Sequence, residues 1–73
     1  MRQLRLHREV YRGEAVDEAV KVYAKYATFD LKEEQAHWLV EVTSSSPARE
    51  RRIADELANY ALGLTIRDRR RAG

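Results

Sequence analysis

The chain has no cysteine, one proline and three glycines among its 73 residues. Without cysteine it can form neither a disulfide nor a thiolate site for zinc or an iron-sulfur cluster. Three glycines are too few for a glycine-rich phosphate loop, and neither of the glycine motifs that bind nucleotides is present. The sequence therefore predicts no cofactor. The lack of cysteine fits a reducing compartment, and we expect the cytoplasm.

Long apolar runs are also missing. No stretch reaches the length that spans a bilayer, and the first residues lack the apolar segment of a secretory signal. The 14 basic and 12 acidic side chains nearly cancel, leaving a net charge of +2, which is typical of a solvated surface rather than a strong attractant of polyanions. The length fits one domain, 1–73, whose small core would gain from a second copy or a partner.

Three segments have the character of β-strands. Residues 4–11 alternate between apolar and polar, with Arg8 as the exception. A period of two predicts a half-buried strand. Segments 28–31 and 37–43 are rich in β-forming residues and are separated by the polar run 32–35, so they predict a hairpin.

Two segments have helical spacing of their apolar residues. In segment 14–27 acidic residues occupy the first turn, and Asp17 lies four residues before Lys21, a spacing that favours a weak ion pair. The second helix is expected to begin at Ser46 as the cap and Pro47 as the first helical residue. Its apolar stripe consists of Ile53, Leu57, Tyr60, Ala61 and Leu64. Its solvent side is expected to carry Arg49, Glu50, Arg51, Arg52, Asp55 and Glu56.

Gly63 leaves two interpretations of the last segment. The helix either ends there, so that Leu64 to Arg67 forms a short fourth strand, or continues through the glycine at a cost of about 1 kcal/mol. We favour continuation. The ordered core is expected to cover about residues 3–66, and the basic segment 67–73 is expected to be a solvated tail.

The element order β-α-β-β-α predicts an α+β fold, a two-layer sandwich that corresponds to a truncated ferredoxin-like plait. Both helices must cover one face of so small a sheet. A right-handed crossover followed by the hairpin gives an antiparallel sheet of order 1-3-2. The first strand is then an edge, whose unpaired N–H and C=O groups can receive another chain. The residues predicted to contact a partner at this edge are Leu4, Leu6, His7, Val10 and Tyr11. Tyr11 and Leu39 are expected to be exposed on the outer face of the sheet, where a partner would also cover them.

No group of residues is typical of an active site. The serine run 44–46 lacks the strand–turn motif of a hydrolase, and the carboxylates occupy wet positions where burial would not raise their pKa values. His7 and His37 are expected to approach each other on the outer face of the sheet, yet a metal site would need a third ligand. We therefore predict neither an enzyme nor a metal site.

Clusters of arginine raise a second hypothesis, a weak electrostatic nucleic-acid binder. The residues that would follow a phosphate backbone are Arg49, Arg52, Arg67, Arg69 and Arg70. Plait-like RNA binders stack bases on aromatic side chains of the open sheet face. The outer face expected here has few aromatic residues, so protein or peptide binding remains the first hypothesis.

Three runs resemble a known family: Tyr11 to Tyr26, Trp38 to Val42, and Glu56 to Leu62. Together they are similar to the small D component of the His-Xaa-Ser system, over about residues 8–66. The resemblance implies an accessory protein that works beside radical S-adenosylmethionine maturases on a ribosomally made peptide, and it transfers no catalytic residue. The chain departs from the family after Gly63, where a longer final helix is expected.

From these observations we expect a small non-enzymatic adaptor. Its partner would be a protein or peptide, such as a radical S-adenosylmethionine maturase or its substrate peptide, or a second copy of the chain in a homodimer.

Overall fold

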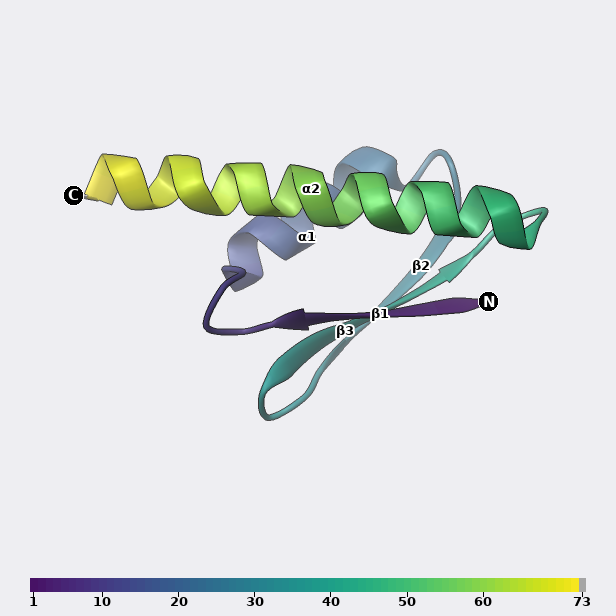
Figure 1. Cartoon of the computed structure of the whole chain (residues 1–73), viewed down its shortest axis with the longest axis horizontal. Helices are drawn as coiled ribbons and strands as arrows, with labels where there is room; N and C mark the ends of the chain where they lie inside the picture. The colour runs from purple at the N-terminus through teal and green to yellow at the C-terminus, as the bar shows by residue number, and fades with distance from the viewer. Residues whose placement is uncertain (73) are drawn as a thin grey trace.

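The computed structural model describes residues 1–72, with side chains to residue 70 (Figure 1). Its elements are β1 (Arg2–His7), α1 (Gly13–Tyr23), β2 (Thr28–Glu33), β3 (His37–Thr43) and α2 (Pro47–Ala72). The strands form one antiparallel sheet in the order β1-β3-β2. The predicted α+β fold, element order and sheet order are confirmed.

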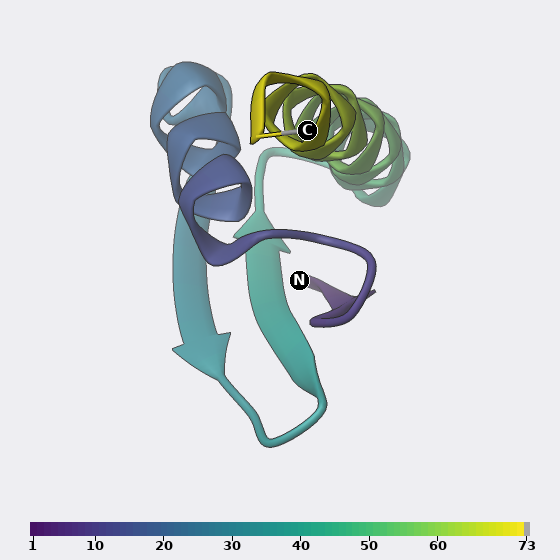
Figure 2. The same ribbon diagram turned by 90° about the vertical axis from the view of Figure 1, so that its left-hand side faces the viewer.

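Both helices lie on the same face of the sheet (Figure 2). α2 lies above β1 and β3, and α1 lies beside α2 on the side of β2. The core between the layers consists of Leu6, Val16, Ala19, Val40, Val42, Ile53, Ala54, Leu57 and Ala61. In the part of the chain that the structure describes, the opposite face of the sheet carries no helix, as Figure 2 shows. We call it the open face.

β1 ends at His7, so the prediction of a strand over 4–11 is wrong in its second half. The carbonyl of His7 accepts the N–H groups of Val10 (3.0 Å) and Tyr11 (2.9 Å), which closes a turn. Tyr11 packs against the core instead of lying on the outer face. The alternating pattern continues through this turn although the extended backbone does not.

Arg8, the exception in the alternating pattern, occupies a helix-side position at the end of β1. Its guanidinium lies over the ring of Trp38, 4.4 Å from the centroid, and pairs with Glu33 at 3.0 Å. A cation over an exposed aromatic face is worth about 0.5–1 kcal/mol. Arg8 therefore covers Trp38 at the end of the core, at a position where the alternating pattern predicts an apolar residue.

Trp38 also fixes the start of α1. Its Nε1 donates a hydrogen bond to the carbonyl of Tyr11 (3.0 Å), and its ring lies against Gly13. A Cβ at Gly13 would lie 3.0 Å from Cζ2 of Trp38. A side chain here would press on the indole ring, so glycine is favoured. Gly13 is the first residue of α1.

α1 is shorter than predicted. The Asp17–Lys21 ion pair is confirmed at 3.1 Å. The helix ends at Tyr23, however, and residues 24–27 form turns in which Tyr26 donates its N–H to the carbonyl of Tyr23 (2.9 Å). These turns bring Tyr26 to the end of α1, beside the beginning of α2.

α2 begins as predicted: Ser46 Oγ accepts the N–H of Arg49 (3.2 Å), and Pro47 is the first helical residue. The helix then continues through Gly63, so the alternative fourth strand at 64–67 is wrong, and the expected tail is helical to Ala72. Gly63 lies in open space, while Leu64 and Thr65 continue the buried stripe. At about 1.5 Å per residue α2 is about 39 Å long. No helix of the described residues is apolar enough over its length to cross a membrane.

Two predicted side-chain positions on α2 are wrong. Tyr60 is 38% exposed and leans towards α1 instead of filling the core, its ring 5.9 Å from that of Tyr23. Glu50 is 5% exposed instead of facing solvent. Its carboxylate accepts the N–H of Ser44 (2.8 Å) and pairs with the amino group of Met1 (3.2 Å). The hydrogen bond from Ser44, followed by the amino group, lowers the pKa of Glu50, so the buried carboxylate is compensated.

Thr65 joins α2 to the first turn of α1. Its hydroxyl is fully buried, accepts the N–H of Arg12 (3.2 Å) and donates to the carbonyl of Ala61 (2.9 Å). Arg12 is the cap of α1 and makes no capping bond with its own side chain. Thr65→Val keeps the shape but removes this acceptor, so we expect it to lower the free energy of unfolding by about 1 kcal/mol. Urea denaturation measures the loss. Thr65→Ser, which keeps the hydroxyl, is the control, and a Val variant as stable as the parent would contradict the linkage.

Candidate binding surface

The backbone of β1 has one side against β3 and one side free. Arg8 donates its N–H to the carbonyl of Ala36 (3.0 Å), one step beyond the last residue of β1. Hydrogen-bonded pairs alternate along an antiparallel ladder. The register therefore directs the N–H and C=O groups of Leu4 and Leu6 towards β3.

The same alternation turns the backbone of the intervening residues outwards. These groups are the N–H and C=O of Gln3 and Arg5 and the N–H of His7; the carbonyl of His7 is used by the turn. Among the described residues no strand pairs with this side of β1. We call this row of groups the β1 edge. Such a row is a template for another extended chain.

β2 forms a second edge, which the sequence interpretation did not consider. Its outward backbone belongs to Phe29, Leu31 and Glu33. Glu33 places a charge on the helix side of this edge, and Asp30 and Lys32 place charges on the open face. Charges on both faces of an edge strand oppose the addition of another strand. β1 carries two charged side chains, Arg2 and Arg5, where β2 carries three, and leucines occupy the middle of its helix side. Fewer charges oppose an added strand on β1, so it is the more receptive edge.

One flank of α2 lies beside β1 and the turn that follows it. Arg69 donates to two carbonyls of that turn, at 2.8 and 3.3 Å. Ala58 and Leu62 belong to the same helical stripe and are half-buried. Ile66 and Val10 are 44% and 43% exposed. A chain added at the β1 edge would therefore meet an apolar helix flank on one face.

The open face carries a polar network. Glu41 accepts from Gln3 (3.3 Å) and pairs with Lys32 (3.0 Å), and Arg5 pairs with Glu34 (3.3 Å). The hydrogen bond between Lys32 and Glu41 is the main cause of a raised pKa for Lys32 and a lowered pKa for Glu41. These side chains already satisfy one another in part, so the open face gains less from a partner than the backbone edge does.

Leu39 and the histidines also lie on the open face. Leu39 is 7% exposed between Arg5 and Lys32, so the prediction that it is exposed is wrong. His7 and His37 form a cross-strand pair with ring centroids 5.1 Å apart. His7 Nδ1 accepts the N–H of Glu9 (3.2 Å). In residues 1–72, no cluster of three His, Asp or Glu side chains is placed to hold a metal ion.

The six residues predicted for partner contact do not form one exposed surface. His7 and Val10 are exposed, Leu4 and Tyr11 are half-buried, and Leu6 and Leu39 are buried. The side chains of Leu6 and Leu39 cannot reach a partner without repacking. The accessible feature is the outward backbone of Gln3, Arg5 and His7. The sequence predicted unpaired backbone groups on this edge but not which residues carry them.

The arginines of the nucleic-acid hypothesis form two groups on α2. Arg49 and Arg52 lie in its first turns, and Arg67 and Arg70 lie about 27 Å further along the helix. Arg69 donates to the carbonyls of the turn after β1. The five residues therefore do not lie together at one site.

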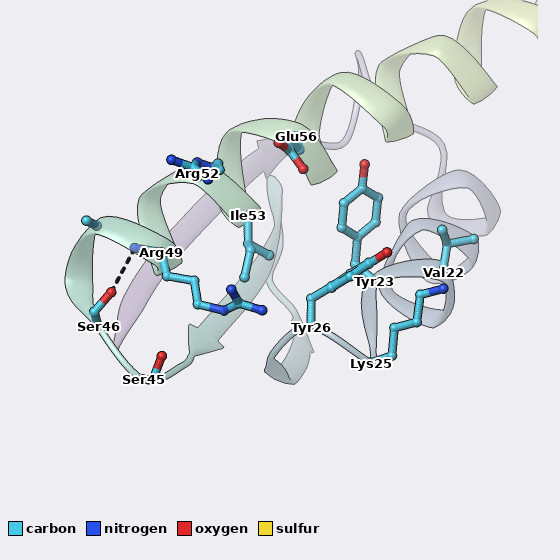
Figure 3. Close-up of a pocket in the computed structure, with 11 residues that line it drawn as sticks. Val22, Tyr23, Lys25, Tyr26, Ser45, Ser46, Arg49, Arg52, Ile53 and Glu56 are labelled. Carbon is cyan, nitrogen blue, oxygen red and sulfur yellow. Dashed lines mark hydrogen bonds between the residues drawn. The ribbon is translucent and has the colours of Figure 1, made fainter.

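A groove that was not predicted lies between the end of α1 and the start of α2 (Figure 3). We call it the tyrosine groove. Its volume of about 760 Å³ is within the range of ligand pockets. Its lining includes Val22, Tyr23, Lys25, Tyr26, Ser45, Ser46, Ala48, Arg49, Arg52, Ile53 and Glu56. Residues 22–26 and 45–56 are distant in the sequence, so no local pattern could indicate the groove.

Tyr23 is the central aromatic residue of the groove. Its ring lies 6.0 Å from that of Tyr26, and its hydroxyl end lies near Glu56 (Figure 3). Burial, followed by the negative charge of Glu56, raises the pKa of Tyr23. Both effects disfavour the charged form of the phenol.

Comparison of the chain with known protein families, with curated proteins and with solved structures finds no match. The functional argument therefore depends on the geometry described above, and membership of the His-Xaa-Ser system stays a prediction.

Proposed function

We propose that the protein is a small adaptor, with no catalytic activity of its own, that binds a protein or peptide by adding it as a strand to the β1 edge. The observation that carries the proposal is the row of outward backbone groups on Gln3, Arg5 and His7. Strand addition draws its affinity from main-chain hydrogen bonds. The apolar flank of α2 beside this edge supplies area that an added strand would cover.

The resemblance to the His-Xaa-Ser system favours a maturase or its substrate peptide as the partner. A peptide that must be held in an extended form before modification suits an edge of this kind, because the side chains on the open face of the new strand stay available while the others lie against α2. The adaptor would then position the peptide for the maturase without taking part in the reaction.

A second copy of the chain fits the same edge. If two β1 strands pair antiparallel with Leu4 on the two-fold axis, Gln3 lies opposite Arg5 of the partner subunit. This register brings outward groups together and keeps the two Arg5 side chains from facing each other directly, which would be unfavourable. Light scattering over a range of concentrations separates a homodimer from an edge that is vacant until a peptide binds.

Hydrogen exchange of individual amides tests the proposal. In the dilute monomer we expect slow exchange at Leu4 and Leu6 and fast exchange at Gln3, Arg5 and His7, because only the former donate to β3. A peptide selected from a random decapeptide library should slow the fast set on binding.

Slow exchange at all five positions in the free monomer would contradict a vacant edge. Protection on addition of an oligonucleotide at about 50 mM salt, with none from peptides, would favour the nucleic-acid hypothesis instead.

A further inference from the structure

The tyrosine groove carries an excess of positive charge. Lys25, Arg49 and Arg52 line it together with a single carboxylate, Glu56, so its formal excess is two charges. In the described residues none of the three cations takes part in an ion pair. The net charge of the whole chain is +2. The unbalanced charge in this groove thus equals that of the entire protein.

The first turn of α2 adds to this positive potential. Ser46 and Ala48 line the groove at the N-terminal end of the helix, where the unpaired N–H groups and the helix dipole favour negative charge. Ser46 satisfies the N–H of Arg49. The guanidinium of Arg49 extends across the groove towards Tyr26, and the hydroxyl of Ser45 lies below it (Figure 3).

The other wall of the groove is aromatic and apolar. Tyr26 is 45% exposed, although it packs against Tyr23 and beneath the ammonium group of Lys25, 5.2 Å from its ring. Val22 lies beside it and is also exposed. A ligand that bears only charge would leave this wall uncovered, whereas an apolar side chain next to acidic groups would cover it.

Glu56 favours an acidic peptide over a nucleic acid as the ligand of the tyrosine groove. It lies beside Tyr23, at the end of the groove away from Ser45 (Figure 3). A nucleic-acid backbone repeats its negative charge and would bring phosphate towards this carboxylate. A peptide carries N–H donors between its acidic side chains, and these suit an acceptor such as Glu56.

We propose that the tyrosine groove binds a short acidic peptide segment. Its carboxylates contact Lys25, Arg49 and Arg52, and an adjacent aromatic or large apolar side chain packs on Tyr26. The site lies between the helices, away from the β1 edge, and does not depend on the adaptor role proposed for that edge.

Fluorescence anisotropy with a fluorescein-labelled hexapeptide of glutamate, aspartate and phenylalanine tests the proposal. Arg49→Gln combined with Arg52→Gln is expected to weaken binding about tenfold, since two screened charge contacts are lost. The matched control, Arg67→Gln combined with Arg70→Gln, removes the same charge from exposed positions at the other end of α2 and should leave the affinity within about twofold. Tyr26→Ser should remove the preference for phenylalanine over alanine in the peptide.

Three results would overturn the assignment. They are no binding of the acidic peptide at low salt, an equal loss in the two double variants, and tighter binding of a single-stranded oligonucleotide that is lost in the Arg49/Arg52 variant. Circular dichroism establishes that each variant is folded. Arg5→Pro alters the β1 edge and removes the Arg5–Glu34 ion pair, but neither residue lines the groove. It should therefore leave the hexapeptide affinity unchanged, so failure of one proposal is distinguishable from failure of the other.

Discussion

Leu57→Ala is expected to lower the free energy of unfolding by about 3 kcal/mol. Leu57 is the largest of the fully buried side chains and belongs to the core that α2 forms with α1 and the sheet. Truncation loses its transfer free energy and leaves a cavity that the surrounding strands and helices cannot fully close. Domains of this size are stable by only about 4–11 kcal/mol in total, so the loss is a large fraction.

Urea denaturation followed by the fluorescence of Trp38 measures this effect. Ile66→Ala is the matched control, because Ile66 lies on the same helix but is exposed, and its truncation should change the stability by less than about 0.5 kcal/mol. Equal losses in the two variants would contradict the arrangement in which α2 buries Leu57 against the sheet.

Proline substitutions at neighbouring positions of β1 are expected to differ in their effect on stability: one destabilises the protein and the other is tolerated. Leu4→Pro removes an N–H that donates to β3 and should destabilise the protein by more than about 2 kcal/mol. Arg5→Pro removes an N–H that faces outwards, a position at which edge strands tolerate proline. The Arg5 variant should therefore stay folded and bind an edge-directed peptide about tenfold more weakly, since one main-chain hydrogen bond and the close approach are lost.

Thermal unfolding and titration with the library-selected peptide measure the two effects. Arg5→Gln removes the same charge without altering the backbone, so it separates electrostatics from strand addition. Two proline variants of equal stability would show that the inferred alternation of the ladder is wrong. An Arg5→Pro variant that is folded and retains full affinity would remove the β1 edge as the peptide site.

The architecture could be predicted because its determinants are local. Large apolar residues occupy every second position of β3 on its helix side, Ser46 and Pro47 begin α2, and the acidic first turn marks α1. These short-range signals, with the rule that two helices share one face of a small sheet, suffice for the order β1-β3-β2.

The errors occur where a long-range contact overrides the local pattern. The extended backbone expected through Val10 and Tyr11 is replaced by a turn, closed by two hydrogen bonds to His7, and Trp38 holds this turn in place from another strand. Glu50 is buried because Ser44 supplies an N–H, which residue type alone does not indicate. Burial of Leu39 likewise depends on its neighbours across the sheet.

The binding surfaces were harder to predict than the fold. Which backbone groups of β1 face outwards depends on the phase of its hydrogen bonding with β3, and that phase leaves no trace in side-chain alternation. The tyrosine groove requires the early end of α1 at Tyr23, which moves Tyr26 into a turn beside Arg49. The sequence predicted that segment as further helix.

The phase of hydrogen bonding in β1 also constrains what can be recognised. A strand added at the β1 edge continues the pleat of β1, so every second side chain would lie beneath α2 and the others would lie on the open face beside Gln3, Arg5 and His7. A peptide strand whose side chains are all apolar or all charged would be mismatched on one of its two faces. The edge therefore selects for alternation of apolar and polar side chains rather than for any single residue. It would accept many sequences that share this period of two.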